Sequence, residues 1–204
     1  MLVDSLIKNE WLKTPEIISA FRKIKRKDFM TEETKGFSEV DEAMLIGKGQ
    51  TISQPLVVAF MLEKLNPKPK QKILDIGSGS GWTSALLAYI VGLGGKVIAI
   101  EIIPELKEFG QKNASKYNFV KKGIAEFICA DGSKGYKKEA PFDNILVSAS
   151  LSSKIPFSWK KQLKIKGKIV APIKDSIWVF EKESENKFKK TEYPGFVFVS
   201  FVSK

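Results

Sequence analysis

A chain of 204 residues is long enough for one full domain and short for two. Apolar residues make up 43% of it, as in ordinary globular proteins, and no apolar run approaches the roughly 18 residues of a membrane-spanning helix. With no histidine and one cysteine, Cys129, the composition excludes an internal disulfide, a Ser-His-Asp triad and a zinc site built from cysteine and histidine.

The positive net charge of the chain bears on whether the protein binds nucleic acid. The formal net charge is +11, from 34 basic and 23 acidic residues, and an excess of this kind is typical of proteins that bind phosphate backbones. Only Arg22 and Arg26 are arginines, however, and arginine is the usual residue for bidentate phosphate and base contacts. The densest basic run covers residues 22–27. We therefore expect a solvated, lysine-rich surface, with a nucleic-acid face as the weaker alternative.

The N-terminus bears on the location of the protein. Residues 1–10 read MLVDSLIKNE, which lacks the basic segment and apolar core of a secretory signal. We expect a cytoplasmic protein that acts as a monomer and has no membrane partner. Cys129 falls in a strand-like run, where we expect a buried thiol that behaves as a small apolar side chain.

In chain order, the first part of the sequence is expected to be helical. Residues 1–29 carry apolar side chains at helical spacing, and Pro15 lies where the first turn of a helix tolerates proline. Residues 30–54 look irregular, and a loop of that length is uncommon unless it serves a function. Residues 55–65 again have the spacing of a helix.

The next stretch, residues 72–82, reads KILDIGSGSGW. A short apolar run leads into Gly77, Gly79 and Gly81, and a helix-like run follows over residues 82–91. Strand, glycine turn and helix in this order are typical of the first unit of a nucleotide-binding α/β fold, where N–H groups at the helix start meet polar ligand atoms. The spacing G-x-G-x-G differs from the G-x-G-x-x-G of dinucleotide-binding turns. It favours another nucleoside ligand, and the alternative is an ordinary turn without a nucleotide.

Strands and helices alternate through the rest of the chain. We expect strands at residues 96–100, 126–130, 142–147, 168–172, 177–182 and 195–201, helices at residues 104–117 and 159–163, and a hairpin turn at residues 184–186. This order predicts an α/β fold: a doubly wound, mostly parallel, Rossmann-like sheet with an N-terminal helical extension and a β-rich C-terminal tail. We expect a single domain over residues 1–204, with a helical part at residues 1–69 and a cofactor-binding α/β part at residues 70–204.

Polar residues stand where predicted strands end, which is where such sheets bind ligands. Glu101 can accept hydrogen bonds from both ribose hydroxyls; the alternative is a solvated loop glutamate. Asp131 can accept from an adenine amino group, with Gly132 leaving room for the ring; the alternative is a turn-forming pair. Asp75 lies inside its strand, so we expect it to order the glycine turn by accepting from backbone N–H groups. The candidate cofactor-binding residues are Asp75, Gly77, Ser78, Gly79, Ser80, Gly81, Glu101, Asp131 and Gly132.

A more specific pattern precedes the helix at residues 55–65. Residues 47–55 read GKGQTISQP, which resembles the signature of the protein-L-isoaspartate (D-aspartate) O-methyltransferase family, and the glycine turn resembles motif I of S-adenosylmethionine-dependent methyltransferases. Further segments agree with that family in order and spacing: Phe29 with Asp41, Trp82, Asp131-Gly132, and residues 141–143, 155–156, 162–164 and 170–172. The resemblance covers roughly residues 20–175.

The resemblance implies a carboxyl O-methyltransferase that uses S-adenosyl-L-methionine, without a metal, on isoaspartyl and D-aspartyl residues of damaged proteins and so allows their repair. A carboxylate is ionised at neutral pH and is itself the nucleophile, so no histidine base is needed. The implied substrate-binding residues are Thr51, Ile52 and Ser53. Ser53 is also the implied catalytic residue, a hydroxyl that orients the reacting groups; the alternative is that Ser53 caps the following helix.

The sequence departs from the family pattern around the peptide-binding side and the tail. Glu39 stands where an aromatic residue is usual, Ala43 and Leu45 replace prolines, and Lys166 replaces a glycine. Residues 198–201 read FVSF in place of FVPL. These changes leave two alternatives open: a methyltransferase for another substrate such as RNA, and a protein that binds S-adenosylmethionine without catalysis.

Overall fold

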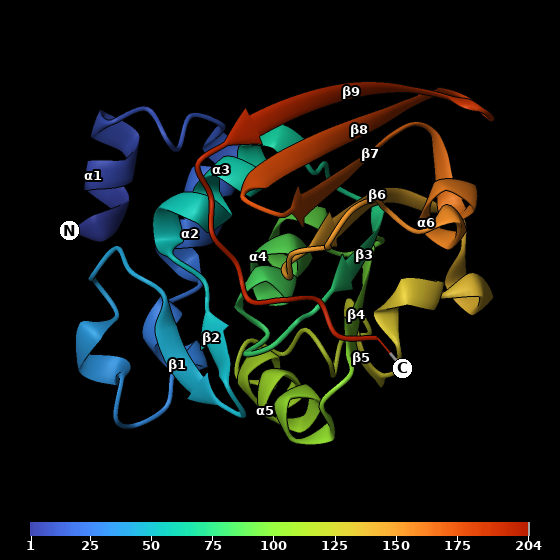
Figure 1. Cartoon of the computed structure of the whole chain (residues 1–204). Helices are drawn as coiled ribbons and strands as arrows, with labels where there is room; N and C mark the ends of the chain where they lie inside the picture. The colour runs from blue at the N-terminus through green and yellow to red at the C-terminus, as the bar shows by residue number, and fades with distance from the viewer. Residues whose placement is uncertain (204) are drawn as a thin grey trace.

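Residues 1–203 are described by a computed structural model, which is built around a seven-stranded sheet (Figure 1). The strand order is β5-β4-β3-β6-β7-β8-β9. The bounds of these strands are Lys72–Ile76 for β3, Lys96–Glu101 for β4, Ala125–Cys129 for β5, Phe142–Val147 for β6, Leu163–Ile173 for β7, Ser176–Ser184 for β8 and Lys187–Pro194 for β9. All but the last of the strands expected from the sequence are confirmed, with β7 beginning earlier than expected.

The parallel part of the sheet places the glycine turn where the strand order reverses. β3 pairs in parallel with β4 on one side and with β6 on the other. Open α/β sheets bind ligands in the crevice that forms at such a point. β7 is parallel to β6, whereas β8 and β9 complete the sheet as antiparallel strands. The expected doubly wound, mostly parallel sheet is therefore confirmed.

Helices cover both faces of the sheet because successive residues of a strand face opposite sides. Ile73 of β3 belongs to the core that contains α3, α4 and α5, whereas its neighbour Leu74 belongs to the core on the other face. On that second face, the fully buried ring of Trp159 comes from α6. The helices span Pro55–Leu65 for α3, Trp82–Val91 for α4, Pro104–Ser115 for α5 and Phe157–Gln162 for α6.

The N-terminal part contains a hairpin that local sequence signals did not predict. The elements before α3 are α1 at Leu2–Lys8, α2 at Pro15–Lys23, 3-10 helices at Arg26–Phe29 and Lys35–Phe37, β1 at Met44–Gly47 and β2 at Gln50–Ile52. The expectation of an irregular stretch over residues 30–54 is thus wrong, since β1 and β2 pair as a separate antiparallel sheet. Gly47, Lys48 and Gly49 have φ values of 92°, 53° and 69°, so this turn uses the left-handed region that glycine adopts readily.

The C-terminal strand expected at residues 195–201 is misplaced. The edge strand is β9, which pairs with β8 across the turn at residues 184–186. The sequence of β9, KFKKTEYP, is polar because an edge strand is largely exposed. The apolar run after it leaves the sheet edge and returns to the middle of the molecule (red in Figure 1), where the Val199 carbonyl accepts from the Ser150 N–H at 2.8 Å.

Cys129 also differs from its expected state. It is the last residue of β5, at the edge of the sheet, and its thiol is exposed rather than buried. The strand-like sequence around it predicts β5 correctly, but it does not show that this end of β5 is uncovered. Within residues 1–203, none of the helices combines the length and the apolar character needed to cross a membrane.

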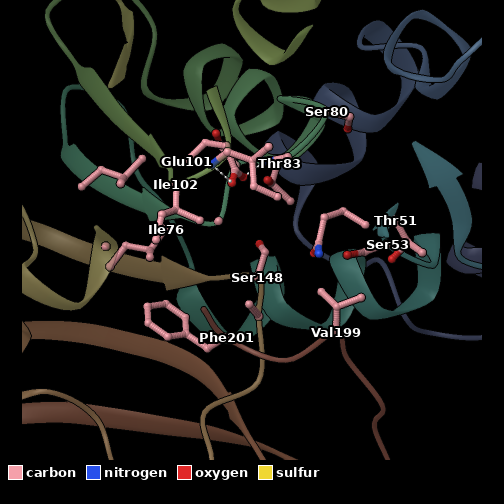
Figure 2. A pocket seen from close by; sticks show the side chains of 18 of the residues that line it. Thr51, Ser53, Ile76, Ser80, Thr83, Glu101, Ile102, Ser148, Val199 and Phe201 are labelled. Carbon is pink, nitrogen blue, oxygen red and sulfur yellow. Dashed lines mark hydrogen bonds between the residues drawn. The ribbon is translucent and has the colours of Figure 1, made fainter. Parts of the chain in front are cut away.

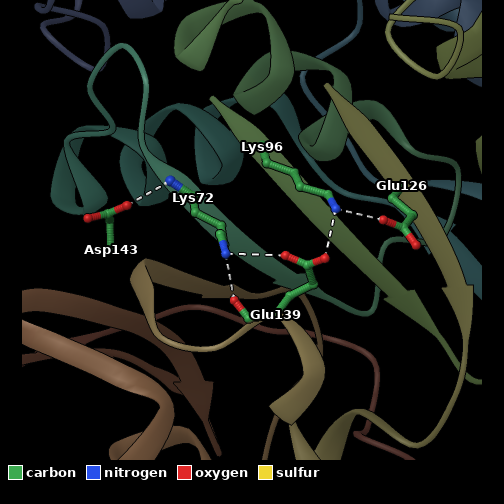
Figure 3. Close-up of polar contacts among 5 residues, drawn as sticks. All are labelled: Lys72, Lys96, Glu126, Glu139 and Asp143. Atoms are coloured by element: carbon green, nitrogen blue, oxygen red, sulfur yellow. Dashed lines mark hydrogen bonds and ion pairs between the residues drawn. The ribbon is translucent and has the colours of Figure 1, made fainter. Parts of the chain in front are cut away.

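An ion-pair network holds the end of the sheet opposite the glycine turn (Figure 3). The Lys96 Nζ atom lies 2.9 Å from carboxylate oxygens of both Glu126 and Glu139, and the Lys72 Nζ atom lies 3.2 Å from Glu139. The Lys72 N–H donates to Asp143 at 2.7 Å. Hydrogen bonds from Lys96 and then Lys72 lower the pKa of Glu139. The network joins the starts of β3, β4 and β5 to the segment before β6.

Candidate active site

A cavity lies at the carboxyl ends of the parallel strands, where the sequence predicts a ligand site. Its wall is formed by the glycine turn after β3, the end of β4, the segment through β2, the residues after β6 and the C-terminal segment (Figure 2). Of the residues singled out from the sequence, the wall contains Thr51, Ile52, Ser53, Gly77, Ser78, Gly79, Ser80, Glu101 and Gly132. Those that lie outside the wall are Asp75, Gly81 and Asp131.

The glycine turn is held by a close backbone approach to α5. A Cβ atom placed on Gly81 would lie 2.6 Å from the carbonyl oxygen of Gly110, and one placed on Gly110 would lie 2.8 Å from the carbonyl oxygen of Gly79. Asn113 adds a hydrogen bond from its side-chain amide to the Ser80 carbonyl at 3.1 Å. Glycine is therefore required both at Gly81 in the turn and at Gly110 in α5. The helical spacing of Gly110 in the sequence does not show this requirement.

Glu101 is a buried part of the cavity wall, with 6% of its surface exposed. Its carboxylate accepts from the Gly79 N–H at 2.9 Å and from the Ile103 N–H at 3.0 Å. The alternative of a solvated loop glutamate is therefore wrong. The carboxylate links the end of β4 to the glycine turn, and it faces the cavity beside Thr83 in Figure 2.

Asp75 is fully buried and differs from its expected role. Its Oδ2 atom accepts from the hydroxyls of Thr83 at 3.1 Å and Ser84 at 2.6 Å, whereas the sequence led us to expect backbone N–H donors. Burial raises the pKa of Asp75 to about 6, the two hydroxyls oppose this shift, and the charge of Glu101 adds to it. Asp75 thus ties β3 to the start of α4 from beneath the turn and does not reach the cavity wall.

Asp131 and Gly132, which the sequence predicts to contact an adenine ring together, have different positions in the structure. The Asp131 carboxylate accepts from the Ser133 N–H at 2.9 Å, so it caps the short 3-10 helix Gly132–Lys134. Gly132 lines the cavity, and a Cβ atom there would lie 2.4 Å from Cγ2 of Ile76. The glycine therefore permits a close approach between this segment and β3, while Asp131 lies behind the wall.

Ser53 lines the cavity but does not cap α3. Gln54 is the N-cap residue, and no side chain of the cap accepts a hydrogen bond there. The Asp41 carboxylate instead accepts from the Leu56 N–H at 2.8 Å, so a residue distant in sequence satisfies the helix start. The Ser53 hydroxyl makes no hydrogen bond to another described residue and is left to face the cavity with Thr51 (Figure 2).

Arg26 is a buried residue that the sequence reasoning placed on a solvated basic surface. Its guanidinium donates to the carbonyls of Val40 at 3.0 Å, Glu42 at 2.6 Å and Ser53 at 3.3 Å. The guanidinium also lies 5.6 Å from the ring centre of Trp82. Burial lowers the pKa of Arg26 to about 10, and the charge of Asp41 partly opposes the shift. Arg26 thus joins the signature segment to the helix that follows the glycine turn.

Two buried polar atoms in the cavity wall lack a protein partner. The Ser78 hydroxyl and the indole Nε1–H of Trp82 make no hydrogen bond within the described part of the chain. Buried polar groups are normally paired, so such atoms in a cavity wall fit a polar ligand. With the apolar side chains of Ile76, Ile100 and Ile102 around them, the site suits an amphipathic molecule such as a nucleoside.

A second cavity adjoins the first. Four residues line both cavities: Thr51, Ser53, Ser148 and Val199. The rest of the second cavity is largely apolar and is formed by α3, by Trp11 and by the segment that follows β9. The two cavities therefore join at a wall that carries the three hydroxyl groups of Thr51, Ser53 and Ser148.

The sequence pattern of the protein-L-isoaspartate (D-aspartate) O-methyltransferase family matches residues 1–204. The chain belongs to this family. It is 36% identical over 207 residues to the protein-L-isoaspartate O-methyltransferase of Methanopyrus kandleri, an alignment that covers 100% of this chain and 90% of that protein. It is 41% identical to the protein-L-isoaspartate O-methyltransferase 2 of Archaeoglobus fulgidus, over 90% of this chain and 84% of that protein.

The fold of the chain agrees with this membership. A Plasmodium falciparum structure described as a protein-L-isoaspartate O-methyltransferase, in complex with S-adenosyl-L-homocysteine, superposes with a TM-score of 0.90. Its sequence is 23% identical, and the match covers 100% of this chain and 97% of that chain. In this protein-L-isoaspartate (D-aspartate) O-methyltransferase family member, the departures from the family pattern at residues 198–201 fall beside the site, since residues 199–202 line the first cavity.

Proposed function

We propose that the chain is an S-adenosylmethionine-dependent carboxyl O-methyltransferase that acts on isoaspartyl and D-aspartyl residues of damaged proteins. Membership of the family supports this function. The observation that carries it is the junction of the two cavities, where Thr51 and Ser53 line both the cavity beside the glycine turn and the largely apolar groove along α3. A peptide lying in the groove would bring its carboxylate to that junction.

The residues of the first cavity fit the proposed cofactor. Glu101 stands at the end of β4, where its carboxylate can accept from ribose hydroxyls, and Gly132 with the nearby isoleucines suits an adenine ring. Ser78 and Trp82 supply the unpaired polar atoms. When bound, S-adenosylmethionine supplies a methyl group activated by its sulfonium. Asp75 would act on the cofactor only through the glycine turn that it supports.

The chemistry assigned to the chain itself is positioning. The substrate carboxylate is already ionised, so the side chains at the junction have no proton to remove. Hydroxyl groups orient the carboxylate by donating hydrogen bonds, and the walls formed by Val199 and Phe201 limit water around it. We also propose that residues 1–204 act as one domain, since the N-terminal hairpin and the α/β part line the same cavity. A monomer in the cytoplasm is a separate proposal, which rests on the sequence alone.

The test is methyl transfer to a peptide pair that differs only in an isoaspartyl or a normal aspartyl linkage. We expect transfer to the isoaspartyl peptide and much less to its normal isomer, since the signature segment resembles that of isoaspartyl methyltransferases. Calorimetry with S-adenosyl-L-homocysteine and with NAD provides the cofactor control. Equal rates on the two isomers would contradict repair specificity. Transfer to RNA alone, or cofactor binding without transfer, would replace the proposal with one of the two alternatives.

A further inference from the structure

Ser148 is a hydroxyl residue at the junction that the sequence reasoning did not identify. It follows β6 directly, and its N–H donates to the carbonyl of Ile76 at 2.9 Å, which anchors it beside the start of the glycine turn. Figure 2 shows its hydroxyl oxygen directed into the space framed by Glu101, Ser53 and Phe201. The hydroxyl makes no hydrogen bond to another described residue, so it is available to a ligand.

The position of Ser148 differs from that of the neighbouring serines. The Ser150 hydroxyl is used by the fold, because it donates to the carbonyl of Lys174 at 2.8 Å. Ser78 lines the first cavity but not the second, so it lies away from the junction. Ser148 lines both cavities and stands on the end of a buried strand, whereas Ser53 reaches the same junction from the segment that follows β2.

We propose that Ser148 is a second catalytic hydroxyl, which donates a hydrogen bond to the substrate carboxylate from the sheet side while Ser53 donates from the hairpin side. This inference rests on the proposed function. A carboxylate has two oxygens with several lone pairs, so one oxygen can accept from the hydroxyls while the other attacks. Two donors from opposite walls define the orientation of the carboxylate more narrowly than one donor does.

The hydroxyls keep their protons throughout the proposed step. One carboxylate oxygen forms a bond to the methyl carbon as the bond between that carbon and sulfur breaks, and the bonding electron pair goes to sulfur. The negative charge of the carboxylate and the positive charge of the sulfonium are lost together, leaving a neutral ester and a thioether. No proton is transferred, which is why a serine hydroxyl suits this position in a chain without histidine.

The experiment compares Ser148→Ala, Ser148→Thr and Ser148→Val by steady-state kinetics on an isoaspartyl peptide. Threonine and valine have nearly the same shape, so that pair isolates the hydroxyl from the effect of volume. We expect kcat/KM to fall on the order of 10- to 100-fold in the Ala and Val variants and to recover in the Thr variant. The affinity for S-adenosyl-L-homocysteine should stay within about twofold, since a hydroxyl that serves the substrate is not needed for the cofactor. Ser153→Ala, at an exposed serine outside both cavities, is the matched control.

A double-mutant cycle with Ser53→Ala tests whether both hydroxyls hold the same carboxylate. We expect the combined loss to be smaller than the product of the two single losses, because groups that act on one substrate atom are not additive. Wild-type kinetics in Ser148→Val would overturn the role of Ser148 while leaving the proposed function intact. If the wild-type protein binds the cofactor but does not methylate isoaspartyl peptides, the proposed function is contradicted. Ser148 would then have no isoaspartyl carboxylate to orient.

Discussion

At the scale of single residues, the structure places two carboxylates near the glycine turn in different electrostatic settings. Glu101 accepts two backbone N–H groups and faces the cavity. Asp75 is fully buried, its pKa is raised to about 6, and its Oδ1 atom has no hydrogen-bond partner in the described chain. The proximity of Glu101 adds to the cost of charging Asp75. We therefore expect protonation of Asp75 at mildly acidic pH to stabilise the fold.

Asp75→Asn tests that relation through the pH dependence of stability. The folded pKa of Asp75 lies above its unfolded value, so the folded state takes up a proton as pH falls through about 6. In the wild type, this proton should add about 1.4 kcal/mol to the free energy of unfolding between pH 8 and pH 5, and the Asn variant cannot gain it. Urea unfolding of both proteins at each pH measures their difference. A difference that does not change between pH 8 and pH 5 would contradict the raised pKa.

At the scale of elements, the site depends on contacts between segments that are distant in sequence. Arg26 holds the carbonyl of Ser53 and the ring of Trp82, and Asp41 satisfies the start of α3. On the other side of the cavity, α5 approaches the glycine turn so closely that Gly110 has no room for a Cβ atom. The shape of the turn is thus determined by its neighbours as well as by its own glycines.

Gly110→Ala tests the contact between α5 and the glycine turn. Alanine is the better helix former by about 1 kcal/mol, but its Cβ atom would lie 2.8 Å from the Gly79 carbonyl oxygen and 3.1 Å from the Gly81 nitrogen. We expect a net loss of about 1–3 kcal/mol in the free energy of unfolding and a weaker affinity for S-adenosyl-L-homocysteine, because the turn must shift. Denaturant unfolding and calorimetry measure the two effects. Gly36→Ala is the control, because nothing lies within 4 Å of the new Cβ atom there. If Gly110→Ala gains stability and keeps its affinity for S-adenosyl-L-homocysteine, the contact does not constrain the turn.

At the scale of the whole molecule, the positive charge is separated from the candidate site. Among residues 1–203, no lysine or arginine lines either of the two joined cavities, and Glu101 is the charged residue in their walls. Several lysines are used in ion pairs, including Lys72 and Lys96 at the opposite end of the sheet (Figure 3). The net charge of +11 therefore lies away from the candidate site and does not indicate a phosphate-binding active site.

The salt dependence of activity tests this separation. Methylation of a short isoaspartyl peptide should change little between about 50 and 200 mM salt, since no lysine or arginine in the described part of the chain lines the two cavities. A protein with many phosphate contacts would lose roughly 10³-fold or more in affinity over that range. Initial rates at subsaturating peptide measure the effect, and a neutral and an acidic peptide should be compared. A loss of that size with the neutral peptide would show that the surface lysines take part in catalysis.

The sequence by itself determined the parts of this protein whose signals are local. The apolar run before Gly77, the alternate glycines and the helix after them predict one strand–turn–helix unit, because periodicity and glycine conformations act within about ten residues. The strands before Glu101 and Asp131 are predicted in the same way, and parallel pairing then brings their ends to one edge of the sheet. The signature at residues 47–55 indicates the family, which the match over residues 1–204 confirms.

Only the tertiary structure decided which of these residues reach the cavity. The polar strand β9 is held at the sheet edge by pairing with β8, and the short strands β1 and β2 pair with each other, so the sequences of these strands carry weak signals. The apolar segment after β9 looks like a strand but covers the ends of other strands. Asp75 and Arg26 are buried by segments distant in sequence, and Ser148 faces the cavity because β6 ends beside the glycine turn. Burial and side-chain direction at these positions depend on packing between segments that are distant in sequence. The composition of the chain and the spacing of its residues do not contain this information.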